Sequence, residues 1–90
     1  MATNSYSNQS LVQQLAIVEI TSVEQLRLLG TEYGFLKIKS YFQEADKDIL
    51  VQIEEVIQGI PWNRMTQKRR EEVMDFYGMV MKEEMLELIY

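Results

Sequence analysis

Acidic side chains are the densest groups in this sequence that could perform acid–base chemistry. One group is Glu54 with Glu55, and the other is Glu83, Glu84 and Glu87. Paired carboxylates act as general acid and base when their surroundings hold them at different pKa values. Neither group is accompanied by a nucleophile or a polar pocket signature, so we interpret both as solvated helix faces and predict no catalytic residues.

Metal and cofactor sites are also disfavoured by the residue types present. Glu83 and Glu87 are four residues apart and could share a hard cation, but di-metal helical bundles use Glu-x-x-His motifs and the chain has no histidine. Asp46 and Asp48 lack the glycine and the distal glutamate of a calcium loop. The absence of cysteine excludes zinc–thiolate sites, disulfides and cysteine nucleophiles. We expect no metal, no cofactor and no enzymatic activity.

The stretch QGIPWNRMTQKRREEV, residues 58–73, is the most chemically uneven part of the chain. It holds the single proline, the single tryptophan and four of the nine basic residues. Positive charge near a helix N-terminus opposes the helix dipole, so we expect compensation. Either Glu54 and Glu55 on the preceding helix pair with it, or an acidic or phosphate-bearing partner does. Tryptophan and arginine are enriched at interface hot spots. The predicted partner-binding residues are Trp62, Arg64, Lys68, Arg69 and Arg70.

Methionines are concentrated in the last predicted helix. Five of the six lie at or after residue 65. Methionine repacks easily and recurs on adaptable binding surfaces, although it also fills ordinary cores. Apolar residues continue to the end of the chain, where they would fray unless something covered them. We therefore predict a homodimer, because a two-fold pair is the commonest way to cover such a surface. The predicted self-association residues are Tyr77, Met81, Met85 and Leu88.

Composition sets the class of protein. Ninety residues, 47% of them hydrophobic and 26% charged, are typical of one globular domain. A net charge of −5 argues against a protein that mainly coats nucleic acid, because phosphate binding needs a positive surface. The start MATNSYSNQS lacks the basic and apolar regions of a signal peptide, and we expect a cytoplasmic protein without membrane contact.

The spacing of apolar residues predicts an all-α, small four-helix bundle-like domain. Residues 1–9 are polar and are expected to form a flexible tail, and residues 10–90 a single helical domain. Helices are expected from Ser10, from Thr21 or Ser22, near 49–60 and from Thr66. Residues 15–21 and 35–42 also alternate as strands do. The alternative fold is therefore an α+β domain with a β-α-β unit over residues 15–42, followed by two helices.

Helix boundaries follow from a few residues. Gly30 and Gly34 either end a helix or let another backbone pack closely. Asp46 or Asp48 is expected to cap the third helix, whose apolar stripe includes Ile53, and Gly59 to end it. The segment between the third helix and the last helix, which we call the joint, contains Trp62. We expect Trp62 to anchor this joint to the core.

Two neighbouring segments of the sequence are similar to segments of a known class of small proteins. IEEVIQGIP followed by RREEVMDFYGMV resembles short helical segments of small bacterial antitoxins, in which an I-x-x-L-P turn precedes EVxDFIxFL. No functional residue follows from it. We predict a non-enzymatic protein–protein interaction or adaptor and regulatory protein that self-associates. The alternative is a small nucleic-acid-linked regulator, antitoxin-like, that uses the basic cluster from Arg64 to Arg70.

Overall fold

The computed structural model describes the backbone of residues 11–89 and the side chains of residues 11–83. Its elements are α2 (Leu11–Ile17), α3 (Val23–Leu29), α4 (Thr31–Tyr41), α5 (Lys47–Gln58), the 3-10 helix η1 (Trp62–Arg64) and α6 (Gln67–Ile89). The predicted all-α class is confirmed, and the alternative β-α-β unit over residues 15–42 is wrong, since residues 11–89 contain no strand. The expected tail at residues 1–9 lies outside the described residues.

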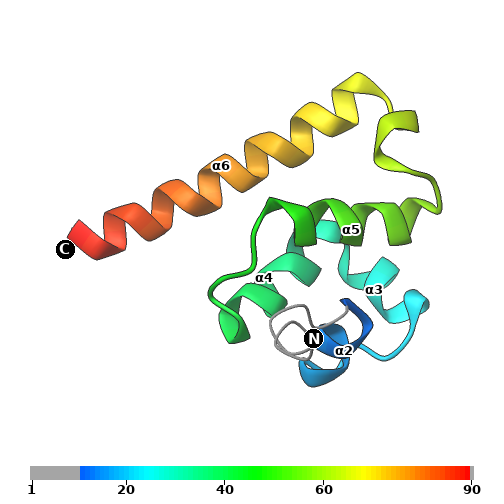
Figure 1. Ribbon diagram of the computed structural model, residues 1–90, viewed down its shortest axis with the longest axis horizontal. Helices are drawn as coiled ribbons and strands as arrows, with labels where there is room; N and C mark the ends of the chain where they lie inside the picture. Colours follow the sequence, from blue (N-terminus) through cyan, green and yellow to red (C-terminus); the bar gives the residue numbers. More distant parts are fainter. Residues whose placement is uncertain (1–10, 90) are drawn as a thin grey trace, which may run out of the picture.

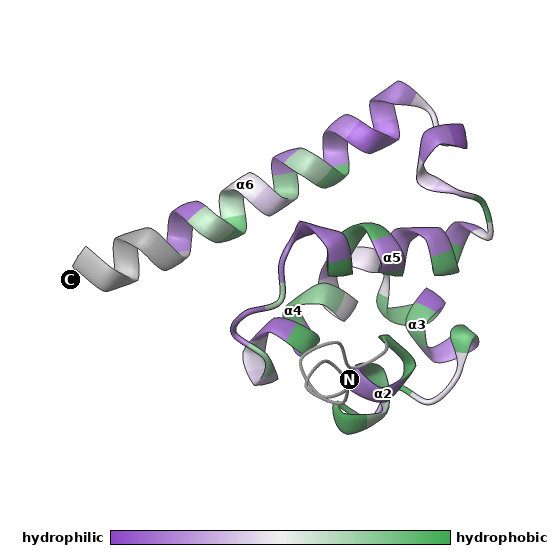
Figure 2. Cartoon of the chain, viewed as in Figure 1, coloured by the Kyte–Doolittle hydropathy of each residue, from purple (hydrophilic) through white to green (hydrophobic). Residues whose placement is uncertain are grey.

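Helix α5 is the centre of the domain. In Figure 1 it lies between α6 on one side and α2, α3 and α4 on the other, and it contacts each of these helices as well as η1. Leu50 and Ile53 on its inner face are fully buried, which confirms the expected burial of Ile53. Figure 2 shows its polar and apolar stretches alternating along the helix, as an amphipathic sequence requires.

Side-chain caps fix where three helices begin. The Ser22 hydroxyl accepts a hydrogen bond from the amide of Gln25 (3.1 Å). The Asp46 carboxylate accepts hydrogen bonds from the amides of Asp48 and Ile49 at the start of α5. The amide of Arg69 donates to the Thr66 hydroxyl (3.1 Å). These groups satisfy helix amides that have no partner within the helix. The predicted caps at Ser22, Asp46 and Thr66 are therefore confirmed.

The two central glycines play different parts. Gly30 ends α3 and opens α4 at a positive φ of 89°, so the helix expected after Thr21 is divided in two. Gly34 lies within α4 where a Cβ atom would be 2.8 Å from Cδ1 of Leu26, so any side chain here would require Leu26 to shift. Because of the break at Gly30, residues 11–89 form five α-helices rather than the four expected.

The first half of α6 closes the core, and its second half extends past it. Val73 is buried, and the rings of Phe76 and Tyr77 meet the buried Phe35 edge-on, with centroids 6.3 and 6.1 Å away. Beyond Val80, α6 continues to Ile89 and runs past α4 and α5 (Figure 1). Among the described residues, no helix is both long and apolar enough to cross a bilayer.

Candidate functional site

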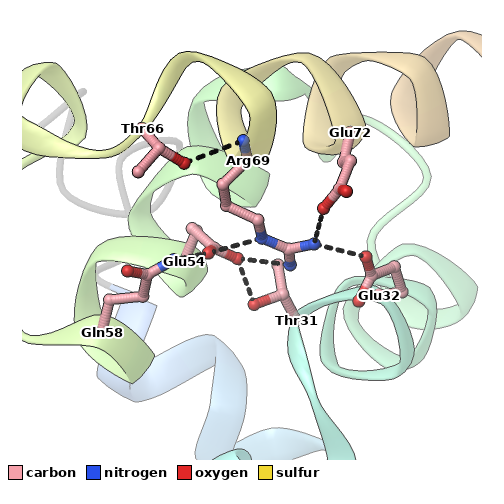
Figure 3. A network of polar contacts seen from close by, with 7 residues as sticks. All are labelled: Thr31, Glu32, Glu54, Gln58, Thr66, Arg69 and Glu72. Atoms are coloured by element: carbon pink, nitrogen blue, oxygen red, sulfur yellow. Dashed lines mark hydrogen bonds and ion pairs between the residues drawn. The ribbon is translucent and has the colours of Figure 1, made fainter.

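Arg69, in the first turns of α6, makes the main polar contact between that helix and the rest of the domain. Its Nε donates to Oε2 of Glu54 at 2.8 Å, and its NH2 nitrogen donates to Oε1 at 2.8 Å (Figure 3). This bidentate geometry is the strongest arrangement that an arginine and a carboxylate form. The expected pairing of the basic cluster with the preceding helix is therefore confirmed for Arg69 and Glu54.

Glu54 is a buried carboxylate whose oxygens are fully used. Only 1% of the residue is exposed. Besides Arg69, Oε1 accepts from the Thr31 hydroxyl at 2.6 Å, and Oε2 accepts from the Gln58 amide. Burial alone would raise the pKa of Glu54, but the hydrogen bonds from Arg69, Thr31 and Gln58 lower it to about 2. Glu54 is therefore ionised at neutral pH and is poorly matched to the role of a general acid there.

Two further carboxylates surround the Arg69 guanidinium. Its NH1 nitrogen lies 3.4 Å from Oε2 of Glu32 and 3.3 Å from Oε1 of Glu72. The hydrogen bond to Glu54 raises the pKa of Arg69, and the charge of Glu32 adds to this effect. We call Thr31, Glu32, Glu54, Gln58, Arg69 and Glu72 the Arg69 network. It links α4, α5 and α6 at one point and fixes how α6 leaves the joint.

The rest of the predicted partner-binding cluster divides into structural and exposed residues. Arg70 donates to the carbonyl oxygens of Asn63 (3.3 Å) and Met65 (3.1 Å), so it holds the joint together. Trp62 is half-buried against the core, and its amide donates to the Glu55 carboxylate at 2.8 Å, which confirms the expected anchor. Arg64 and Lys68 are exposed. A role in partner binding remains a prediction for all five residues.

A hollow of about 320 Å³ opens beside this joint. It is lined by Trp62, Gln67, Arg70, Glu71, Met74 and Asp75. Its walls combine an aromatic ring, a methionine and charges of both signs. The hollow lies against the beginning of α6, on a side of the helix that Met74 shares with Gly78 and Met81 by spacing.

The predicted self-association residues lie in different surroundings. Tyr77 is half-buried against Phe35 and belongs partly to the core. Met81 is half-buried near the outer part of α6. Met85 and Leu88 lie on the described backbone of α6, but beyond the described side chains. Met79, which is not one of the predicted self-association residues, is 64% exposed on another side of the helix.

Four members of the Arg69 network were not predicted: Thr31, Glu32, Gln58 and Glu72. Thr31 and Glu32 carry no motif, and only folding brings Thr31 to the Glu54 carboxylate and Glu32 to the Arg69 guanidinium. Gln58 and Glu72 lie about one turn along the same helix from Glu54 and from Arg69. Glu54 was interpreted as part of a solvated acidic face, which is wrong because it points inward. The available signal was its spacing: Glu54 follows the buried Ile53 and precedes Ile57 by three residues, which places it at the edge of the apolar stripe.

Comparison with known proteins gives one match. A family model described as the TfoX C-terminal domain matches residues 8–77, a span that contains every member of the Arg69 network and the first half of α6. No curated protein and no solved structure matches the chain.

Proposed function

The chain belongs to the TfoX C-terminal domain family, and we propose that it is a non-enzymatic interaction and regulatory domain that associates with a second copy of itself through α6. The observation that carries this proposal is the length of α6. Its 23 residues continue to Ile89, whereas the described side chains of α6 that pack against the core end at Val80. At a rise of about 1.5 Å per residue, residues 82–89 extend α6 by roughly 12 Å, and its backbone runs past α4 and α5 (Figure 1).

The residues of this outer part favour a protein partner. Met81 and Met85 lie about one turn apart on the same side of α6, and methionine-rich helices suit packing surfaces. Exposed apolar surface of this kind marks interaction sites when it is continuous. The Arg69 network supports the same role, because it holds the first turns of α6 rigidly and thereby presents the rest of the helix in a fixed direction.

The chemistry of the site supports a role in binding rather than catalysis. The carboxylate of Glu54, whose pKa is lowered to about 2, is buried and occupied by hydrogen bonds from Arg69, Thr31 and Gln58. A catalytic carboxylate must reach its substrate and must change its protonation state near the working pH. Glu54 is suited to neither task, and its contribution is to the position of α6.

Light scattering on the full chain tests the proposed self-association. We expect the wild type to have twice the 10.6 kDa mass of one chain at tens of micromolar. The double variant Met81→Glu/Met85→Glu is expected to be monomeric with an unchanged helical circular dichroism spectrum, since buried charge opposes association.

Met79→Glu is the matched control. It introduces the same charge on the same helix, at a residue that is 64% exposed and lies outside the predicted surface, and it is expected to remain dimeric. A monomeric wild type would contradict the proposal. A double variant that stays a folded dimer would also contradict it, because the interface would then lie elsewhere.

A further inference from the structure

One side of α6 carries apolar residues at a regular spacing, and among its described side chains only the first, Met74, packs against the core. Met74, Gly78 and Met81 are separated by four and three residues, and positions 85 and 88 continue this alternation along the described backbone. A repeat of four and three is the spacing of helices that pack side by side along their length. We call Met74, Gly78, Met81, Met85 and Leu88 the methionine seam. The core contacts of Val73 and Val80 lie on the neighbouring side.

Gly78 lies in the middle of this seam, and nothing in the described part of the chain requires a glycine there. It is exposed, its φ is ordinary for a helix, and a Cβ atom added to it would meet no atom within 4 Å. Glycine within a helix is destabilising relative to alanine. A second helix packed against the seam would explain the glycine at position 78, because a residue without a side chain lets two helix backbones approach closely.

Charges beside the seam determine the direction of that second helix. Asp75 and Lys82 are both exposed, and they lie seven residues apart, which is two helical turns along the same edge of the seam. In a parallel pair, the edges that carry Asp75 and Lys82 lie on opposite sides of the seam, so these residues do not meet. An antiparallel copy places each Asp75 beside the Lys82 of the other chain, so two opposite-charge pairs form.

The charges at the two ends of α6 also favour an antiparallel pair. The first turns of α6 carry Lys68 and Arg70, whereas Glu83 and the two glutamates that follow it lie toward its end. Antiparallel packing brings the basic beginning of each helix near the acidic end of the other. The hollow beside Trp62 then lies where the end of the second helix arrives, next to Met74.

We propose that the partner of α6 is a second copy of this chain, and that the two helices pack antiparallel along the methionine seam around a two-fold axis close to Gly78. Asp75 of each chain lies beside Lys82 of the other, and Met81 of each lies within one turn of Gly78 of the other. This inference rests on the proposed self-association and adds its direction and register.

Cysteine cross-linking tests the direction, and the absence of native cysteine makes it specific. Two single variants, Asp75→Cys and Lys82→Cys, are oxidised separately and as a mixture. In the proposed pair, unlike positions are adjacent, whereas like positions are about 10 Å apart along the axis. A disulfide needs Cα atoms within about 7 Å. Leu28→Cys, at a residue on α3 that is 89% exposed, measures the background rate.

The expected result is rapid formation of the mixed disulfide and background rates for each variant alone. Rapid disulfides in each variant alone, without the mixed product, would mean that like positions are adjacent and would overturn this register while leaving self-association intact. If light scattering shows a dimer but every sample cross-links at the background rate, the two helices are parallel or the interface lies on another surface, and this inference is overturned as well. A monomeric wild type would overturn both proposals together.

A pair of substitutions at Gly78 tests the close approach independently. Both Gly78→Ala and Gly78→Leu favour the helix. Leucine fills the space required by the second helix, so the dissociation constant of the dimer is expected to rise roughly tenfold or more. An unchanged or tighter dimer in Gly78→Leu, with the same helical content as Gly78→Ala, would show that the seam is not an interface.

Discussion

Arg69 on α6 holds the buried carboxylate of Glu54 on α5 through two hydrogen bonds of 2.8 Å each (Figure 3). The two residues are fifteen positions apart, on either side of the joint that contains Trp62. This contact fixes the direction in which α6 leaves the core. The position of the methionine seam therefore depends on it, although neither residue belongs to the seam.

Removing one partner of this pair is expected to destabilise the fold strongly. Arg69→Met leaves the charge of Glu54 buried without compensation, which costs about 3–5 kcal/mol in comparable cases. Urea unfolding at pH 7 measures the loss. Lys68→Met is the matched control, because Lys68 is the exposed neighbour of Arg69, and it is expected to change the free energy of unfolding by less than about 0.5 kcal/mol. Equal effects of the two substitutions would show that the network contributes little.

Replacing both partners by apolar residues is expected to recover much of the loss. Glu54→Leu/Arg69→Met removes the desolvation cost of both charges, and such replacements are often close to neutral. The single variants and the double variant together form a cycle that measures the coupling between the two side chains. A double variant that is as unstable as the sum of the two single variants would mean that they are not coupled.

Acid is expected to weaken the fold through Glu54. Its pKa falls from 4.5 in the unfolded chain to about 2 in the folded protein, so the unfolded state binds this proton first as the pH is lowered. The stabilisation is present above pH 4.5 and is lost as the pH falls toward 2. Unfolding free energies measured across this range should fall more steeply for the wild type than for Glu54→Gln, which has no carboxyl group at this position. Identical slopes would contradict the assigned pKa.

Ile53→Ala is expected to lower the free energy of unfolding by about 2–5 kcal/mol, because it leaves a cavity at a fully buried position on α5. Val56→Ala removes apolar atoms from the same helix at a residue that is 37% exposed, and it should cost clearly less. Thermal or urea unfolding checks both. A loss under about 1 kcal/mol for Ile53→Ala would be inconsistent with its burial.

Nucleic-acid binding through the basic cluster is expected to be weak. Arg69 and Arg70 make contacts within the chain, which leaves Arg64 and Lys68 as the exposed cations of the cluster, on a chain with a net charge of −5. Fluorescence anisotropy with duplex DNA and with RNA at several salt concentrations measures this. Tight binding that weakens steeply with salt and is lost in Arg64→Ala/Lys68→Ala would favour the alternative function as a nucleic-acid-linked regulator.

The sequence was sufficient to predict features that depend on local spacing. The caps at Ser22, Asp46 and Thr66 and the burial of Ile53 follow from patterns within one or two turns. The division of one expected helix at Gly30 was left open, because glycine alone does not reveal whether it ends a helix or allows close packing. Pairing of Glu54 with the basic cluster was one of the two expected alternatives, but the inward direction of its carboxylate was not predicted, because its partner Thr31 lies 23 residues away.

Hydrogen exchange measured at high and at low protein concentration tests the central claim most directly. The backbone amides of α6 beyond Val80 should be protected at high concentration and should exchange quickly after dilution, whereas those near Val73, which lie on the core, should stay protected at both. Exchange of the outer part of α6 that does not depend on concentration would contradict self-association through this helix. So would concentration-dependent protection that appears only in α2 or α3.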